Sequence, residues 1–384
     1  MAKRVFLHIG LPKTGTTFLQ SVLWAHSDSL AASGLLLPGR ERRDHLWASC
    51  VVRGEPNLDR RHPLAASAWE RLLQATQEWD KDVLITHEFF CSASTEQAQD
   101  MVAKLSADER HLVITARDTL DLFTSSWQES LKNKGTAPIE AYGASTSDDP
   151  VVVWNWRSLD LGLVLQRWMP AFAPADVHVV STPHPPARQE VLWRRFAGVI
   201  GIDADSVDLS VARPNPTLGL VEAETLRRLN SVLTDFDKPF DRGVWIRTFL
   251  ADERLVPRGG EPFWPSPALV DDCRRRGREA VDLLWARGID LTGTSEDLLT
   301  PPSLPERRHP DSVTDAEVAV VAVQLAAQLL GDARRLTGQV RRLTAAQAVK
   351  PSVRGAAYAL ALALRGAVRD HTFARGQPNS RARA

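Results

Sequence analysis

Six residues near the start of the chain have the types and spacing needed to hold an anion: Gly10, Lys13, Thr14, Gly15, Thr16 and Thr17. Glycine lets the backbone close around a ligand, lysine supplies a positive charge, and threonine hydroxyls donate hydrogen bonds. An apolar run ends just before these residues, and a run at helical spacing follows them. This order places them at a helix N-terminus, where backbone N–H groups and the helix dipole favour a phosphate.

The segment differs from the loop of nucleotide triphosphatases, whose pattern is G-x-x-x-x-G-K-[ST]. Gly10 and Gly15 have the spacing of that pattern, but Thr16 stands where its lysine belongs, and Lys13 lies inside the loop. We also find no apolar run that ends in an acidic residue well suited to hold magnesium. The loop is therefore expected to bind a phosphate that is not part of a magnesium-bound triphosphate.

Two ionisable residues, His87 and Glu88, follow a short apolar run over residues 82–86. Catalytic groups of open α/β sheets gather at the carboxyl ends of parallel strands, so each residue is a candidate proton acceptor. Because side chains alternate along a strand, both can face one site only if the strand has already ended. The competing interpretation is structural, with a carboxylate that caps the next helix beside a buried histidine.

Arg117 and Ser125 form the third candidate group. Arg117 directly follows an apolar run over residues 112–116, and Ser125 lies eight residues later in a segment with helical spacing. The guanidinium fork matches a phosphate, and the serine adds a hydroxyl donor. Asp118 between them is expected to cap the helix.

These groups require strands and helices in alternation. We expect strands near residues 5–9, 82–86, 112–116 and 177–181, each followed by a helix. The pattern predicts an α/β protein with a P-loop-like three-layer fold around a central, mostly parallel sheet. Residues 39–61 and 243–267 are expected to be irregular.

Residues 11–20, LPKTGTTFLQ, resemble the 5′-phosphosulfate loop of the sulfotransferases, usually PK[ST]GT[TS]-aromatic-Leu. Arg117 and Ser125 resemble the 3′-phosphate site of the same family, R-D-x-x-x-x-x-x-S. The resemblance implies 3′-phosphoadenosine 5′-phosphosulfate as cosubstrate, without a metal. It places Lys13 against the oxygen that leaves with the nucleotide, and it makes Glu88 the favoured base, with His87 as the alternative.

The resulting hypothesis is a sulfotransferase that moves a sulfuryl group to a hydroxyl or amine acceptor, such as a sugar, a lipid or a secondary metabolite. Two alternatives remain. A P-loop kinase would bind ATP with magnesium and would be indifferent to a 3′-phosphate. A non-catalytic nucleotide-binding protein of the same fold would bind the cosubstrate without turnover.

Composition sets broader limits. The 384 residues include 47 lysines and arginines and 47 aspartates and glutamates, so no overall charge favours nucleic acid as a partner. Three widely spaced cysteines indicate neither a disulfide framework nor a zinc site. With no secretory leader and no apolar run near ~20 residues, a cytoplasmic location is expected.

The C-terminal part differs in composition from the rest. We expect an α/β domain over residues 1–299, a proline-rich linker over 300–312, and a helical or partly disordered extension over 313–384. From residue 331 onward, the sequence contains eleven lysines and arginines but only two aspartates. Such a basic extension is suited to a peripheral contact with a membrane or a protein partner.

Overall fold

The computed structural model describes residues 1–184, 188–211 and 217–346. The chain divides into two compact units, residues 1–318 and residues 319–384. The first unit contains the sheet and all the candidate site residues named above.

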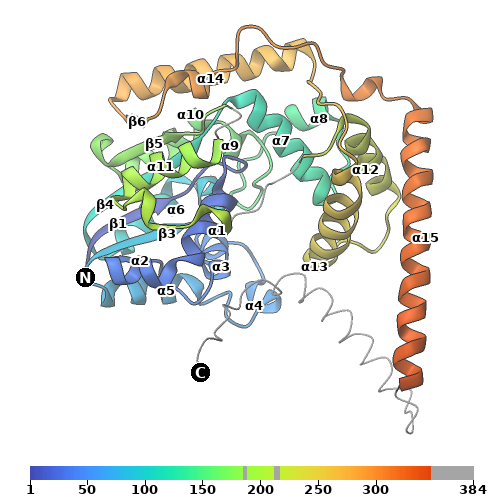
Figure 1. The fold of residues 1–384 in the computed structure, drawn as a ribbon. Helices are drawn as coiled ribbons and strands as arrows, with labels where there is room; N and C mark the ends of the chain where they lie inside the picture. The colour runs from blue at the N-terminus through green and yellow to red at the C-terminus, as the bar shows by residue number, and fades with distance from the viewer. Residues whose placement is uncertain (185–187, 212–216, 347–384) are drawn as a thin grey trace, which may run out of the picture. The chain divides into compact units, whose positions relative to one another are not determined.

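Six strands form one sheet in the first unit (Figure 1). They are β1 (Ala2–His8), β2 (Leu35–Leu36), β3 (Asp82–Thr86), β4 (Ala107–Ala116), β5 (Val177–Ser181) and β6 (Asp290–Thr292). Their order is β2-β3-β1-β4-β5-β6, and each pairing within the sheet is parallel. The expected α/β class with a parallel central sheet is confirmed.

Helices lie on both sides of this sheet. On one face, α1 (Thr16–Ala25), α2 (Ser27–Ser33) and α11 (Arg188–Ile200) pack on strand side chains in a single apolar cluster. Phe6, Leu84 and Val113 contribute to that cluster from three neighbouring strands. Figure 1 shows α10 (Leu161–Trp168) and α14 (Pro267–Arg287) on the side away from α1 and α2. The sheet is thus the middle of three layers.

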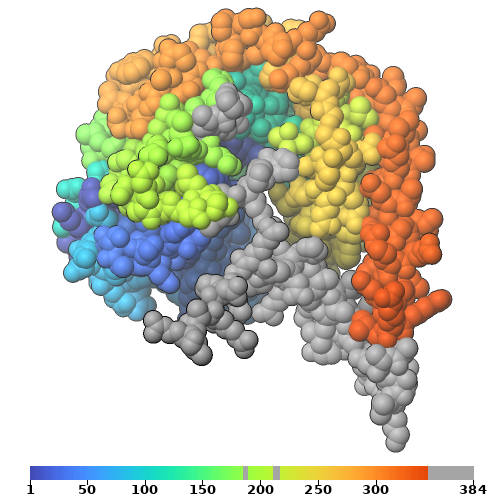
Figure 2. Space-filling model, viewed as in Figure 1, coloured from blue at the N-terminus to red at the C-terminus, as the bar shows by residue number. Residues whose placement is uncertain are grey.

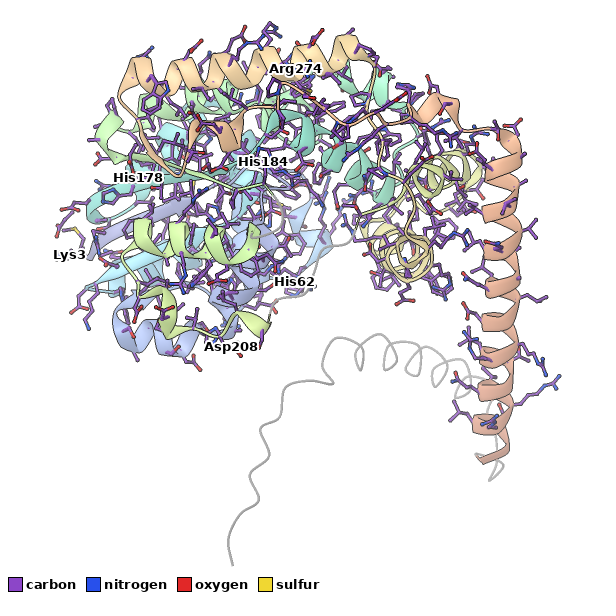
Figure 3. The ribbon with its side chains drawn as sticks, turned by 45° about the horizontal axis from the view of Figure 1, so that its top comes forward. Lys3, His62, His178, His184, Asp208 and Arg274 are labelled. Atoms are coloured by element: carbon purple, nitrogen blue, oxygen red, sulfur yellow. The ribbon has the colours of Figure 1, made fainter. Side chains whose placement is uncertain are left out.

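The register brings the carboxyl ends of the central strands together. His8, the last residue of β1, pairs with Thr86 of β3 and with Val113 of β4. Figure 3 shows the direction of the strands, because His178 lies at the amino end of β5 and His184 lies just past its carboxyl end. The carboxyl ends of β1, β3 and β4 therefore lie side by side, and the segments that follow these strands begin at the same place.

The remaining helices of the first unit connect and cover these strands. They are α3 (Arg42–Val52), α4 (Leu58–Arg61), α5 (Ala68–Glu78), α6 (Thr95–Lys104), α7 (Thr119–Lys132), α8 (Ile139–Gly143), α9 (Trp156–Leu159), α12 (Leu220–Val232) and α13 (Pro239–Asp241). A π-helix, η6 (Arg242–Leu255), follows α13.

Two expectations about irregular segments are wrong. Residues 39–61 contain α3 and α4, and much of residues 243–267 belongs to η6. In α3 the charged residues of the first turn obscure the helical pattern, although Ala48 and Cys50 are buried. Tertiary packing, rather than local periodicity, stabilises such helices. Strands β2 and β6 have two and three residues and were too short to recognise as patterns.

The C-terminal segment begins with a single long helix. The expected linker over residues 300–312 ends in a short 3₁₀ turn, η9 (Pro310–Ser312), and α15 (Asp315–Ala346) follows. Among the described helices, α15 has the length and composition of a membrane-crossing helix over Asp315–Thr344, where an 18-residue window has a mean hydropathy of 1.4. The rest of the expected extension, residues 347–384, lies outside the described residues.

Candidate functional site

The loop between β1 and α1 has an unusual backbone. Gly10, Lys13 and Gly15 have φ angles of 43°, 68° and 92°. Gly15 is the N-cap of α1, and a Cβ atom there would lie 2.5 Å from Leu192 Cδ2. Lys13 lacks the freedom of glycine, and holding a non-glycine residue in this region costs on the order of 1 kcal/mol. The loop thus turns sharply enough to present the N-terminus of α1 as an anion site.

Hydrogen bonds from the carboxyl end of β4 and within the loop hold this loop in place. Arg117 Nη1 donates to the backbone oxygen of Lys13 at 2.9 Å. The Thr14 hydroxyl donates to the backbone oxygen of Leu11 at 2.7 Å and also contacts Thr115 Oγ1 at 2.7 Å. Thr14 is fully buried, so its hydroxyl stabilises the loop and does not line the cavity described below.

His8 continues this network beneath the loop. Its ring nitrogens contact the hydroxyls of Thr86 and Thr115 at 2.8 and 3.2 Å, and the side chain is fully buried. Burial lowers the pKa of His8 to about 3. The imidazole is therefore neutral at physiological pH, and it ties the ends of β1, β3 and β4 together.

A cavity of about 710 Å³ opens at this edge of the sheet. Figure 2 shows a hollow in the surface between α11, in lime green, and the yellow residues near 220–255. Seven of the expected site residues line the cavity: Lys13, Gly15, Thr16, Thr17, Glu88, Arg117 and Ser125. The structure thus brings together most of the groups that are spread over 113 positions of the sequence. Thr14 and His87 lie outside the cavity lining.

Glu88 begins a 3₁₀ turn, η1 (Glu88–Ser92), directly after β3. Gln20 of α1 donates a hydrogen bond from Nε2 to Glu88 Oε2 at 3.0 Å and so fixes the carboxylate. Burial alone raises the pKa of Glu88, but His87, the amide of Gln20 and the charge of Arg42 outweigh it, so the pKa lies below 4.5. Glu88 is therefore ionised and can accept a proton.

His87 has a different position. Its Nδ1 accepts a hydrogen bond from the backbone N–H of Phe89 at 3.1 Å and caps η1. Burial lowers the pKa of His87 to about 4. Because β3 ends at Thr86, strand alternation leaves both residues free to face one site, but in the structure only Glu88 lines the cavity.

Helix α7 forms the facing wall of the cavity. Asp121, Ser125 and Glu129 follow one another at intervals of four residues, so they share one helical face. Arg117 forms an ion pair with Asp121. Lys13 Nζ lies 3.0 Å from Glu129 Oε2. The two expected phosphate-binding cations are thus each paired with an α7 carboxylate.

Sequence reasoning missed Glu129, although its four-residue spacing from Ser125 was visible. Glu129 is 7% exposed, and Arg247 of η6 forms a second ion pair with it. Burial raises its pKa, but Lys13 and Arg247 more than compensate and bring the pKa to about 2. The cavity lining also includes Arg42 and Lys132, which no motif had singled out.

Aromatic residues divide between the site and the core. Trp154 lines the cavity with Phe89, and their ring centroids are 6.0 Å apart. Trp156 and Trp168 are buried in the core. Arg258 pairs with Glu222 and does not line the cavity.

Among the described residues, no group of three or more histidine, cysteine, aspartate or glutamate side chains is arranged to hold a metal ion.

Comparison with known proteins gives limited information. No protein-family model and no curated protein matches the chain. Among solved structures, a sulfotransferase from Alicyclobacillus acidocaldarius is similar over 56% of this chain and 88% of its own, with 18% sequence identity and a TM-score of 0.36. A likeness of this size does not assign the chain to a family.

Proposed function

We propose that the protein is a sulfotransferase that uses 3′-phosphoadenosine 5′-phosphosulfate. The observation that carries the proposal is the shared cavity: Lys13 and the N-terminus of α1 meet Arg117 and Ser125 there, with Glu88 beside them. Two cationic positions match a nucleotide with phosphates on its 5′ and 3′ sides. The loop motif that resembles sulfotransferases lies at the first of these positions.

The reaction would be an in-line transfer of the sulfuryl group. Glu88 takes the proton of the acceptor hydroxyl or amine while the acceptor atom forms a bond to sulfur. The bond between sulfur and the 5′-phosphate oxygen breaks, and its electron pair leaves with 3′-phosphoadenosine 5′-phosphate. Lys13 and the N–H groups at the start of α1 stabilise the charge that develops on this oxygen. Arg117 and Ser125 hold the 3′-phosphate, and the step requires no metal ion.

We also propose an acceptor with a partly apolar body. Phe89 follows the proposed base directly, and Trp154 contacts it at the cavity wall. Aromatic rings provide large contact area and stack on flat or apolar groups. A sugar, a lipid or a secondary metabolite that carries a hydroxyl group fits this description.

The test is calorimetric binding of 3′-phosphoadenosine 5′-phosphate, AMP, and ATP with magnesium to the full chain. We expect the 3′-phosphate to add affinity over AMP, and Arg117→Ala to remove about 10- to 100-fold of it, because a hydrogen bond to a charged group contributes about 1.5–3 kcal/mol. The readout is the ratio of the affinity for 3′-phosphoadenosine 5′-phosphate to the affinity for AMP. A ratio is needed because Arg117 also holds the loop at Lys13, so its loss can weaken binding of both nucleotides. Arg43→Ala is the matched control, because Arg43 is exposed and does not line the cavity.

Two results would contradict the proposal. Tighter binding of ATP with magnesium, with no gain from a 3′-phosphate, would indicate the kinase instead. Binding of the 3′-phosphorylated nucleotide without transfer of labelled sulfate to any acceptor in a screen of alcohols and amines would indicate a non-catalytic nucleotide-binding protein.

We further propose that the protein acts in the cytoplasm and that its C-terminal extension contacts anionic lipid peripherally. Within α15, residues 318–331 are uncharged, and four arginines follow at positions 334, 335, 341 and 342. Vesicles with and without phosphatidylserine would test this contact. We expect the full chain to sediment with the anionic vesicles alone, with release at high salt and upon replacement of the four arginines by glutamine. Retention at high salt would indicate an inserted helix, and no sedimentation would exclude the contact.

A further inference from the structure

The ion pair between Lys13 and Glu129 is the feature of the site that the proposed reaction does not use. Lys13 Nζ lies 3.0 Å from Glu129 Oε2, and this carboxylate is buried in the cavity wall. The lysine that should meet the leaving phosphate oxygen is therefore already neutralised by a residue of the protein.

The surroundings of Glu129 let it lose this contact at low cost. Arg247 of η6 pairs with the other carboxylate oxygen, Oε1, so this ion pair does not depend on Lys13. A second pair, Lys132 Nζ with Asp252 Oδ1 at 2.7 Å, also connects α7 to η6. Glu129 would thus remain a paired, ionised group if Lys13 moved to a ligand.

A phosphate that reaches Lys13 must approach this carboxylate. Both groups attract the same ammonium, and attraction between opposite charges is stronger at a buried site than in water. The phosphate and Glu129 therefore compete for one ammonium group, and part of the binding free energy is spent on this exchange.

We propose that Glu129 is an internal counter-ion that exchanges with the nucleotide for Lys13 and thereby weakens product binding. The proposal rests on the sulfotransferase function above, because it assumes that a nucleotide phosphate approaches Lys13. When 3′-phosphoadenosine 5′-phosphate dissociates, the ion pair between Glu129 and Lys13 forms again. Glu129 therefore favours release of the product. Glu129 is thus a residue that sets nucleotide affinity through Lys13, and it takes no part in the bond-making step.

The main test is a double-mutant cycle with Glu129→Gln and Lys13→Ala. We expect Glu129→Gln to tighten binding of 3′-phosphoadenosine 5′-phosphate at least tenfold, mainly through slower dissociation in stopped-flow measurements. In the Lys13→Ala background the same change should alter affinity less than threefold, because the contested ammonium is absent. Unchanged or weaker binding by Glu129→Gln would overturn the proposal. An equal gain in both backgrounds would also overturn it, since that would show simple repulsion without exchange.

Glu129→Asp separates charge from shape. It keeps the carboxylate, so its affinity should stay within about threefold of the wild-type value. Tightening equal to that of Glu129→Gln would show that packing rather than charge is responsible, and would contradict the proposal.

A measurement without nucleotide separates this proposal from the function on which it rests. Acylation of Lys13 by a small amine-reactive reagent can be followed by mass spectrometry. It should be several-fold faster in Glu129→Gln than in the wild type, because Lys13 loses its ion pair with Glu129. Unchanged labelling would show that the pair is absent in solution and would refute the exchange whatever the nucleotide. Faster labelling, together with failure to prefer a 3′-phosphate, would refute the sulfotransferase function and leave only the ion pair established.

Discussion

The two walls of the cavity are built in different ways. The wall at the end of β1 is mainly backbone: Gly10, Lys13 and Gly15 have positive φ angles, and the N-terminus of α1 presents N–H groups. The wall formed by α7 consists of side chains, with Asp121, Ser125 and Glu129 on one helical face. One wall attracts anions and the other carries two carboxylates.

This difference separates fixed charge from adjustable charge. Backbone N–H groups and a helix dipole cannot turn away, so they offer an anion site at all times. Side chains can change partners by rotation, and here the α7 carboxylates pair with Lys13 and Arg117. The structure therefore combines backbone N–H groups of fixed direction with two cations that pair with α7 carboxylates.

The largest expected effect is at the backbone wall. Lys13→Ala should lower kcat by about 10²–10³, because it removes a donor aimed at the developing charge. Nucleotide affinity should change much less, since the α1 N–H groups remain. Steady-state kinetics with labelled cosubstrate, combined with calorimetry, measure both quantities. Equal losses in turnover and affinity would show that Lys13 only binds the nucleotide.

The next effect concerns the base beside that wall. Glu88→Gln should lower kcat by about 10², because the amide cannot accept the acceptor's proton. His87→Gln should retain most of the turnover, since His87 caps η1 and does not line the cavity. Because the pKa of Glu88 is lowered, kcat should stay constant above pH 4.5 and fall as pH drops below it. The reverse order of the two variants would assign the base to His87.

A smaller effect concerns the network beneath the loop. The pKa of His8 is about 3 in the folded chain and ordinarily 6.5, so the unfolded chain binds the extra proton between these values. The stability from neutral His8 is thus complete above pH 6.5 and is lost as pH falls toward 3. Each such histidine adds a slope of about 1.4 kcal/mol per pH unit in this window.

Denaturant unfolding from pH 4.5 to 7 tests this prediction. His8→Asn should reduce the slope of unfolding free energy against pH by the equivalent of about one proton. His62→Asn, a change at a half-buried residue outside this network, should leave the slope unchanged. Identical slopes in wild type and His8→Asn would contradict a neutral His8 in the folded chain.

The smallest expected effect is at the side-chain wall. Ser125→Ala should weaken binding of 3′-phosphoadenosine 5′-phosphate about fivefold and leave AMP unaffected, because a single hydrogen bond contributes about 1 kcal/mol. Ser130→Ala, on the same helix but outside the cavity lining, is the control. A similar loss for AMP would show that Ser125 does not contact the 3′-phosphate.

Local sequence was sufficient for the backbone wall. A strand, a glycine-containing turn and a helix in succession involve neighbouring residues, so the loop from Gly10 to Thr17 and its place before α1 could be predicted. The same holds for the strand ends before Glu88 and Arg117, because short apolar runs mark buried parallel strands. Helix α3 and η6 escaped prediction, since their formation depends on packing against distant segments.

The sequence by itself determined the α/β class, the anion loop and the candidate residues at three strand ends, because these follow from local pattern and residue type. Only the tertiary structure decided which of them meet. It turned Thr14 and His87 into the fold and Glu88 toward the cavity, and it placed Glu129 against Lys13 across 116 positions of sequence. The physical reason is that ion pairs and burial depend on distances in space, and the parallel register of β1, β3 and β4 sets those distances.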